Sequence, residues 1–307
     1  MKGEILEQTA LPRAAGWTVA ASVVLSMRPK QWTKNVVLFA GLVFAGRMFD
    51  PQLVARVTLA AVLFSAISGV IYLVNDLKDV NQDRLHPTKR FRPLASGKLT
   101  ITQAWLAVGA LVLVSLPLAW LISAPFGLAA TVYMGMMLAY SFRLKNLVVL
   151  DVFVIAAGFV LRAVAGGLVA GVPISPWLYV CTSLLALFLG FAKRRQELIL
   201  LDNDASRHRR ILEEYSGPLL DQLIAIVTAS AIIAYSLYSF FSETSHKAPY
   251  MMLTIPFVVY AIFRYLYLIH ARGEGGSPEE VLLKDRPLLG TILLWSVAVV
   301  AVLYTSQ

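Results

Sequence analysis

The sequence contains few charged residues and almost no cysteine. Asp, Glu, Lys and Arg make up 15% of its 307 residues, well below the ~25% of soluble globular proteins. The single cysteine, Cys181, lies inside an apolar run, which excludes a disulfide framework and a thiolate metal site. No metal-ligand spacing links the four histidines, which are His86, His208, His246 and His270. The low charge also argues against a soluble protein.

Apolar residues take the place of the missing charge. They make up 58% of the chain, and the mean hydropathy is +0.70. A transmembrane helix needs about 20 apolar residues, and runs of about that length can be placed at 33–50, 52–75, 101–122, 125–142, 147–170, 176–200, 218–241, 250–271 and 287–305. The sequence therefore predicts an all-α fold, a polytopic membrane bundle of about nine transmembrane helices.

The basic residues are distributed unevenly along the chain. A net charge of +9 in a soluble protein would suggest a nucleic-acid partner. If the amino terminus is cytoplasmic, however, the segments on that side carry all but four of the 27 Lys and Arg residues, the exceptions being Arg47, Arg56, Arg162 and Lys247. By the positive-inside rule this bias predicts the amino terminus inside and the carboxyl terminus outside. Membrane lipids, and no nucleic acid, are the expected surroundings.

The domain organisation is simple. Residues 1–16 are predicted to be a mobile tail without a cleaved signal sequence, and residues 17–307 a single transmembrane catalytic domain. Within that domain the apolar run 17–27 is too short to span, so we expect a helix lying in the cytoplasmic interface. The basic segment RPKQWTKN follows at 28–35. Together, 17–35 would form an interfacial helix and a basic entry to the first span.

Three carboxylates at the end of the second predicted span are the strongest functional signal. Asp76, Asp79 and Asp83, here called the acidic triad, are three and four residues apart and would share one face of a helix. Like charges at that spacing repel, and carboxylates within an apolar span are costly and usually functional. With the amide of Asn75 they form a set of hard oxygen ligands, which favours Mg²⁺ or Mn²⁺. The alternative is a solvated cytoplasmic loop.

Cationic and hydroxyl side chains on the same predicted side of the membrane could bind phosphate groups. The candidates are Lys89, Arg90, Arg92, Tyr140, Arg143, Lys145, Arg162, Lys193, Arg194 and Arg195. Cations at span ends could instead be simple topological anchors. Arg162 differs, because an arginine inside a span costs several kcal/mol unless it faces a polar cavity or an acid. Asp151 is about 16 Å away along the same helix, so we expect Arg162 to face a cavity.

Two smaller groups of candidates complete the predicted site. Lys30, Lys34 and Asn35 could bind a lipid phosphate at the entrance to the first span, although the two lysines could equally be anchors. A second acidic or sugar contact could come from Glu197, Tyr215 and Asp221. For the last two the alternative is a capped helix start at 216–218.

The NDxxDxxxD stretch at 75–83, ending the second of nine predicted spans, resembles the motif of the UbiA superfamily of intramembrane prenyltransferases. The resemblance covers nearly the whole chain. It implies Mg²⁺ on the pyrophosphate of a donor, inside a helical bundle whose central cavity opens to lipid. Typical members carry a second Asp-rich motif after the sixth span, where this sequence has KRRQE at 193–197. A cluster of cations there suits an additional phosphate group.

Three stretches, at 28–35, 75–97 and 158–167, are similar to the decaprenyl-phosphate phosphoribosyltransferase branch of that superfamily. The resemblance implies transfer of 5-phosphoribose from phosphoribosyl pyrophosphate (PRPP) to a polyprenyl phosphate, for cell-wall arabinan synthesis. It also implies a bacterial plasma membrane protein with a cytoplasmic active site, and is compatible with a homo-oligomer. The alternatives are a prenyltransferase acting on a small aromatic acceptor, and a transporter or lipid carrier, against which the one-sided charge argues.

Overall fold

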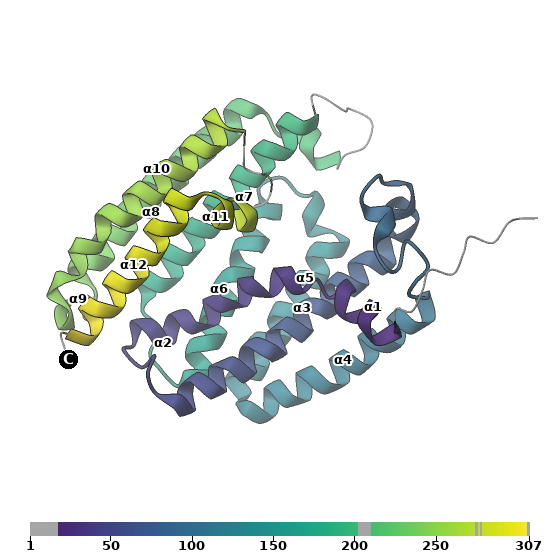
Figure 1. The fold of residues 1–307 in the computed structure, drawn as a ribbon, viewed down its shortest axis with the longest axis horizontal. Helices are drawn as coiled ribbons and strands as arrows, with labels where there is room; N and C mark the ends of the chain where they lie inside the picture. The colour runs from purple at the N-terminus through teal and green to yellow at the C-terminus, as the bar shows by residue number, and fades with distance from the viewer. Residues whose placement is uncertain (1–17, 202–209, 274–275, 277, 306–307) are drawn as a thin grey trace, which may run out of the picture.

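The computed structural model of the protein describes residues 18–201, 210–273, 276 and 278–305, and every regular element within these ranges is helical (Figure 1). The predicted tail at 1–16 lies outside them. The long helices are α3 (Pro51–Leu85), α4 (Ile101–Ile122), α5 (Ala124–Phe142), α6 (Leu150–Ala170), α7 (Pro176–Leu201), α8 (Gly217–Phe241), α10 (Ile255–Ala271) and α12 (Arg286–Thr305). The prediction of an all-α fold is confirmed.

Short helices connect and flank the long ones. The short α-helices are α1 (Val19–Ser26), α2 (Ala40–Phe44), α9 (Glu243–Lys247) and α11 (Pro278–Lys284). The 3₁₀ helices are η1 (Pro29–Phe39), η2 (Lys89–Phe91), η3 (Leu144–Asn146), η4 (Arg210–Glu214) and η5 (Pro249–Thr254). The helix expected within 17–27 is present as α1, and its place at the membrane interface stays a prediction.

Within the described residues, eight helical segments are long and apolar enough to cross a membrane. The prediction of nine is therefore approximate, and the difference lies at the first expected span, 33–50. That stretch is not one continuous α-helix, because η1 leads into α2 and α2 ends at Phe44. Gly46 has φ 67°, and the Arg47 amide donates to the Leu42 carbonyl, which is the hydrogen-bond pattern of a Schellman helix end.

Helix α3 is longer than its predicted span. Asp50 caps its first turn, accepting hydrogen bonds from the amides of Gln52 and Leu53. The helix then runs for 35 residues, about 52 Å, which exceeds the ~30 Å thickness of a bilayer core. It ends ten residues beyond the expected end at 75, and these last turns carry the acidic triad. The triad is therefore on a regular helix, as predicted. The sequence offsets between its three aspartates decide the direction in which each carboxylate points.

The core has two main parts that share α6. One part packs α3 and α5 against the carboxyl-terminal half of α6 and η1, and the other packs α7, α8, α10 and α12 against its amino-terminal half. Figure 1 shows α8, α10 and α12 side by side on one flank, and α3 beside α4 on the other. Helix α6 therefore fixes the position of each half relative to the other.

Close contact between η1 and α6 requires glycine at position 166. A Cβ atom there would lie 1.8 Å from the Leu38 carbonyl oxygen, so any other residue would force the two helices apart. Glycine at a helix interface permits such a close approach of two backbones. The approach also brings the polar side chain of Asn35, on η1, against Arg162, on α6.

Candidate active site

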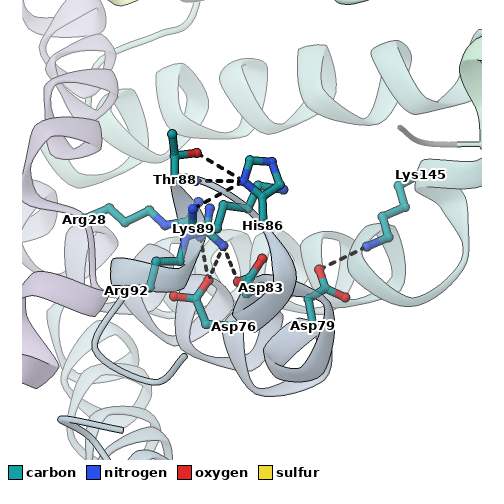
Figure 2. Close-up of polar contacts among 9 residues, drawn as sticks. All are labelled: Arg28, Asp76, Asp79, Asp83, His86, Thr88, Lys89, Arg92 and Lys145. Carbon is teal, nitrogen blue, oxygen red and sulfur yellow. Dashed lines mark hydrogen bonds and ion pairs between the residues drawn. The ribbon is translucent and has the colours of Figure 1, made fainter. Parts of the chain in front are cut away.

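Two members of the acidic triad converge on the same arginine. Asp76 and Asp83 are 2% and 3% exposed and lie two turns apart on α3. The Arg92 Nη1 atom donates to Asp76 Oδ1 at 3.1 Å and to Asp83 Oδ2 at 2.6 Å. Arg28 Nη2 also donates to Asp76 Oδ1, at 2.6 Å. Buried carboxylates are costly unless paired, and these two guanidinium groups supply the pairing (Figure 2).

Asp79 points to a different cation. Its Oδ2 atom lies 3.7 Å from Lys145 Nζ, and its side chain is 32% exposed. Figure 2 shows this pair apart from the cluster of Asp76, Asp83 and the two arginines. The triad is thus divided between two sets of cations, one from η2 and the segment after α1, the other from the connection between α5 and α6.

The donor atoms at this site suit a hard divalent cation. Within the described residues, no three or more His, Cys, Asp or Glu side chains are grouped closely enough to hold a metal ion. The oxygen-only set of the triad nevertheless has the chemistry that Mg²⁺ prefers. Asn75 adds an amide oxygen, Oδ1, that is buried and has no hydrogen-bond partner. An unpaired buried acceptor is unfavourable unless a ligand satisfies it, so these residues fit the ion.

Arg28 contacts the triad although it is not among the residues predicted for the site, where it belongs only to the basic segment 28–35. Its backbone is left-handed, with φ 55° and ψ 69°, which is uncommon for a residue other than glycine and often marks a functional position. The guanidinium lies 4.7 Å from the centre of the Tyr72 ring, on α3. The sequence feature that could have indicated this role is the position of Arg28 between the apolar run 17–27 and Pro29, which opens η1.

The basic residues after α3 differ in where they point. His86 Nδ1 accepts hydrogen bonds from the amides of Thr88 and Lys89, at 3.2 and 3.3 Å, and so shapes the turn into η2 (Figure 2). Lys89 and Arg90 are exposed, with Arg90 over the Phe91 ring. Of the predicted phosphate-binding residues in this segment, Arg92 is the one with an ion pair to the triad among the described residues.

Arg162 is enclosed by neutral groups. It is 6% exposed, and its three nitrogens donate to Asn35 Oδ1 at 2.8 Å, the Gly158 carbonyl at 3.0 Å and Tyr133 Oη at 2.6 Å. Among the described residues it has no ion pair, and Asp151 in particular pairs elsewhere, as its offset predicted. A buried cation with only neutral partners keeps its full charge available to an anion.

Asn35 connects this buried arginine to a cavity of about 290 Å³ between η1 and α3. Its amide nitrogen donates to Ser65 Oγ at 2.8 Å. The remaining lining is mostly apolar: Met27, Trp32, Val36, Phe39, Thr58, Ala61, Val62, Ser65 and Ala66. Of the other predicted lipid-phosphate residues, Lys30 is exposed and Lys34 is partly buried. The structure therefore joins two candidates, Asn35 and Arg162, that lie 127 residues apart in the sequence.

A second acid–arginine cluster lies between α6 and α7. Asp151 is 0% exposed, and its Oδ2 atom accepts from Arg194 Nε at 2.7 Å. The same guanidinium pairs with Glu197 and donates to Tyr140 Oη at 3.4 Å. The expected phosphate-binding arginine is thus already held by two carboxylates. Glu197, expected as a second acidic contact, neutralises it.

Tyr215 joins this cluster from a position two residues before the start of α8. Its hydroxyl donates to Asp151 Oδ1 and accepts from the Val149 amide, both at 2.7 Å. Burial, together with the hydrogen bond to Asp151, raises the pKa of Tyr215 above its ordinary value. Val149 has φ 66° and ψ −46°, a strained conformation for a β-branched residue that costs ~1–3 kcal/mol.

Two of the remaining predicted residues, Arg195 and Asp221, pair with each other. Arg195 donates to Asp221 on α8, and Lys193 is partly buried. The alternative of a capped helix start is confirmed, because Ser216 caps α8 by accepting from the Leu219 amide. Arg143 is exposed in the connection between α5 and α6. At the end of α5, Lys78 Nζ donates to the carbonyls of Ser141 and Phe142, at 2.9 and 3.4 Å, a contact that the sequence did not reveal.

Comparison with known proteins gives the class to which this fold and site belong. The model of the UbiA prenyltransferase family matches residues 35–284, so the chain belongs to that family and is a multi-pass membrane protein. Its fold is similar to a UbiA homolog from Archaeoglobus fulgidus solved with DMAPP and Mg²⁺, with a TM-score of 0.68 and 20% identity over 93% of this chain and 98% of that one.

Curated relatives are more specific. The chain is 34% identical to the decaprenyl-phosphate phosphoribosyltransferase of Mycolicibacterium smegmatis, over 94% of each chain. It is 35% identical to the protein of the same name from Corynebacterium glutamicum, over 93% of this chain and 88% of that one.

Proposed function

We propose that this protein transfers 5-phosphoribose from PRPP to decaprenyl phosphate or a similar polyprenyl phosphate and releases pyrophosphate. The relatives' shared name supports this substrate pair. The observation that carries the proposal over prenyl transfer is the cluster after the sixth expected span. There, among the described residues, Arg194 pairs with Asp151 and Glu197, so these carboxylates are already neutralised by an arginine rather than open to a second magnesium ion on a prenyl pyrophosphate.

The donor site is assigned to the end of α3 and the cations around it. Asp76, Asp79 and Asp83 with Asn75 would hold Mg²⁺, which when bound supplies positive charge to the departing pyrophosphate. Arg28, Arg92 and Lys145 contact these carboxylates directly. If the acids held a metal ion, these three cations would be free to bind donor phosphate oxygens. The remaining phosphate charge would be held by three exposed cations: Lys89 and Arg90, which precede Arg92, and Arg143, which precedes Lys145.

The acceptor is assigned to the other end of the polar region. Ser68, which lies 3.3 Å from Tyr133 Oη, is eight residues before Asp76, about 12 Å along α3, so Arg162 lies deeper in the bundle than the triad. Asn35 and Arg162 could bind the lipid phosphate, with Lys30 and Lys34 nearer the surface. The apolar cavity beside Asn35 would accommodate the first part of the polyprenyl chain.

The reaction needs positioning more than proton transfer. A phosphate oxygen of the lipid is already anionic and forms the new bond to C1 of the ribose as the bond from C1 to the pyrophosphate oxygen breaks. Attack from the opposite face of an α-configured donor would give a β-linked product. The residues of this chain contribute by holding two anionic substrates in line and by stabilising the charge that develops on the leaving group.

The test uses purified protein in lipid nanodiscs. Labelled PRPP and decaprenyl phosphate should give a labelled lipid product, with turnover lost in EDTA and restored by Mg²⁺. A parallel reaction with a prenyl pyrophosphate and 4-hydroxybenzoate should give none. Product in the second reaction and none in the first would replace the proposal with prenyl transfer, and product in neither would reject both.

We also propose that the protein resides in a bacterial plasma membrane with its amino terminus and active site on the cytoplasmic side, and that it acts in cell-wall arabinan biosynthesis. The positive-inside distribution of its Lys and Arg residues supports the orientation. Cysteines placed singly in the η2 segment should react with impermeant thiol reagents only in opened cells. Labelling in intact cells would reverse the orientation.

A further inference from the structure

The connection between α5 and α6, residues 143–149, carries two of the cations proposed for the donor site. Lys145 reaches Asp79, and Arg143 is exposed beside it. Short connections of this kind are usually the mobile parts of a fold. Here, however, side chains from distant parts of the sequence hold both ends of the connection.

Lys78 holds the first end. It lies on α3, next to Asp79, and its ammonium group donates to two carbonyls in the last turn of α5. Carbonyls at a helix end lack partners within the helix, and a cation there also offsets the negative end of the helix dipole. The contact therefore fixes the end of α5, three residues before Lys145, against the helix that carries the acidic triad.

Tyr215 holds the second end. The Val148 carbonyl accepts from the Leu150 amide at 2.7 Å, which with the positive φ of Val149 defines the rare, strained form of the γ-turn. Such a turn leaves the Val149 amide without a partner in its own segment, and the Tyr215 hydroxyl accepts it. Asp151 and Arg194 in turn fix that hydroxyl from α6 and α7.

We propose that Lys78 and Tyr215 are positioning residues that clamp the 143–149 connection, so that Lys145 and Arg143 face the donor site before the donor arrives. The proposal rests on the proposed function for its kinetic consequence, and on geometry alone for the clamp itself. A preorganised site loses less entropy on binding, so releasing the clamp should weaken donor binding more than it slows the chemical step.

The matched pair of variants is Y215F and Y235F. Tyr235 is also buried, and its hydroxyl also makes two hydrogen bonds, to Thr254 and Trp295, but it lies in α8 about 30 Å further along the helix. Both variants should lower the unfolding temperature similarly. Only Y215F should raise the KM for PRPP, by about tenfold with kcat within about twofold, and only Y215F should speed hydrogen exchange in peptides covering 143–150.

A rescue and a double-variant comparison separate positioning from general loss of stability. V149G removes the strain of the positive φ, so the turn no longer depends on the Tyr215 hydrogen bond. The double variant Y215F with V149G should therefore have a KM for PRPP at least threefold lower than Y215F alone. In a background carrying R143Q and K145M, Y215F should change KM by less than about twofold.

An undiminished effect of Y215F in that background, or an equal effect of Y235F, would overturn the proposal. If Y215F does not fold, K78M releases the other end and should give the same KM pattern, with K78R close to wild type. If exchange in 143–150 responds as expected while the wild-type protein does not turn over PRPP, the clamp stands and the proposed function fails.

Discussion

The molecule contains two clusters in which arginines neutralise aspartates, and they differ in their access to water. In the first, Asp76 and Asp83 are buried but their partners Arg28 and Arg92 have side chains 31% and 29% exposed. In the second, Asp151 and Arg194 have side chains 0% and 3% exposed. We call the first the mouth cluster, because its arginines reach water, and the second the core cluster, because both of its partners are buried.

The difference decides what each cluster can do. Cations that reach water can exchange a carboxylate for a phosphate at little cost, because the exposed head group is solvated in either state. Breaking a buried pair leaves an uncompensated charge in a medium of low dielectric constant. We therefore expect substitutions in the mouth to affect turnover, and substitutions in the core to affect folding.

The largest effect is expected for D76A. The substitution removes the carboxylate that both mouth arginines contact and that is proposed as a metal ligand, so kcat/KM for PRPP should fall by about 10³-fold or more. The unfolding free energy should change by less than about 1 kcal/mol, since both arginines can turn to water. Activity assays with thermal unfolding in the same nanodiscs measure both quantities. Turnover close to wild type would remove the metal from the scheme.

Next in size is D151N, with the opposite pattern. The neutral side chain leaves Arg194 without its buried partner, and the unfolding free energy should fall by about 3 kcal/mol. Adding R194M, which removes the buried charge as well, should recover a large part of that loss. A D151N protein as stable as wild type would mean that the core cluster tolerates exchange just as the mouth does.

Arg28 should give an intermediate effect confined to activity. R28M should raise the KM for PRPP by about tenfold, because a cation near the donor phosphates is lost, with stability within about 1 kcal/mol of wild type. R28K keeps the charge but not the stacking on Tyr72 and should lie between. If R28M unfolds the protein instead, Arg28 belongs with the core cluster.

The smallest effect is expected for Asp285, which pairs with Arg264 outside both clusters. The hydrogen bond from Arg264 lowers the pKa of Asp285, so this pair stabilises the fold above the unfolded pKa of about 4 and stops doing so as pH falls through the lower folded pKa. D285N should cost less than about 1 kcal/mol at neutral pH. Its difference from wild type in unfolding temperature should shrink as pH falls below about 4.

Local periodicity was enough to predict part of the mouth. The offsets within the triad predicted one helix face for all three carboxylates, and Asp76 and Asp83 do converge on Arg92, whereas Asp79 points to Lys145. The offset between Asp151 and Arg162 correctly excluded a pair between them. The contact of Arg28 with Asp76 could not be predicted in this way, because it depends on a left-handed backbone that only the surrounding packing makes favourable.

The core cluster depends even more on tertiary structure. Asp151 is 43 residues from Arg194 and 64 from Tyr215, and no periodic pattern links such distant positions. The sequence correctly showed that charge enters the sixth expected span, and the fold decided that Arg194 would meet Asp151 rather than water. Assignments to individual phosphates therefore stay predictions for Lys193, Arg195 and the exposed cations.

The 3₁₀ winding of η1 determines the length of the stretch formed by η1 and α2. A 3₁₀ helix rises ~2.0 Å per residue, against ~1.5 Å in an α-helix, and runs as long as the 11 residues of η1 are uncommon. With the five residues of α2, this stretch extends to about 30 Å, whereas uniform α-helix would give about 24 Å. The 3₁₀ winding therefore lengthens this stretch by about 6 Å and sets how far the start of η1 lies from the end of α2.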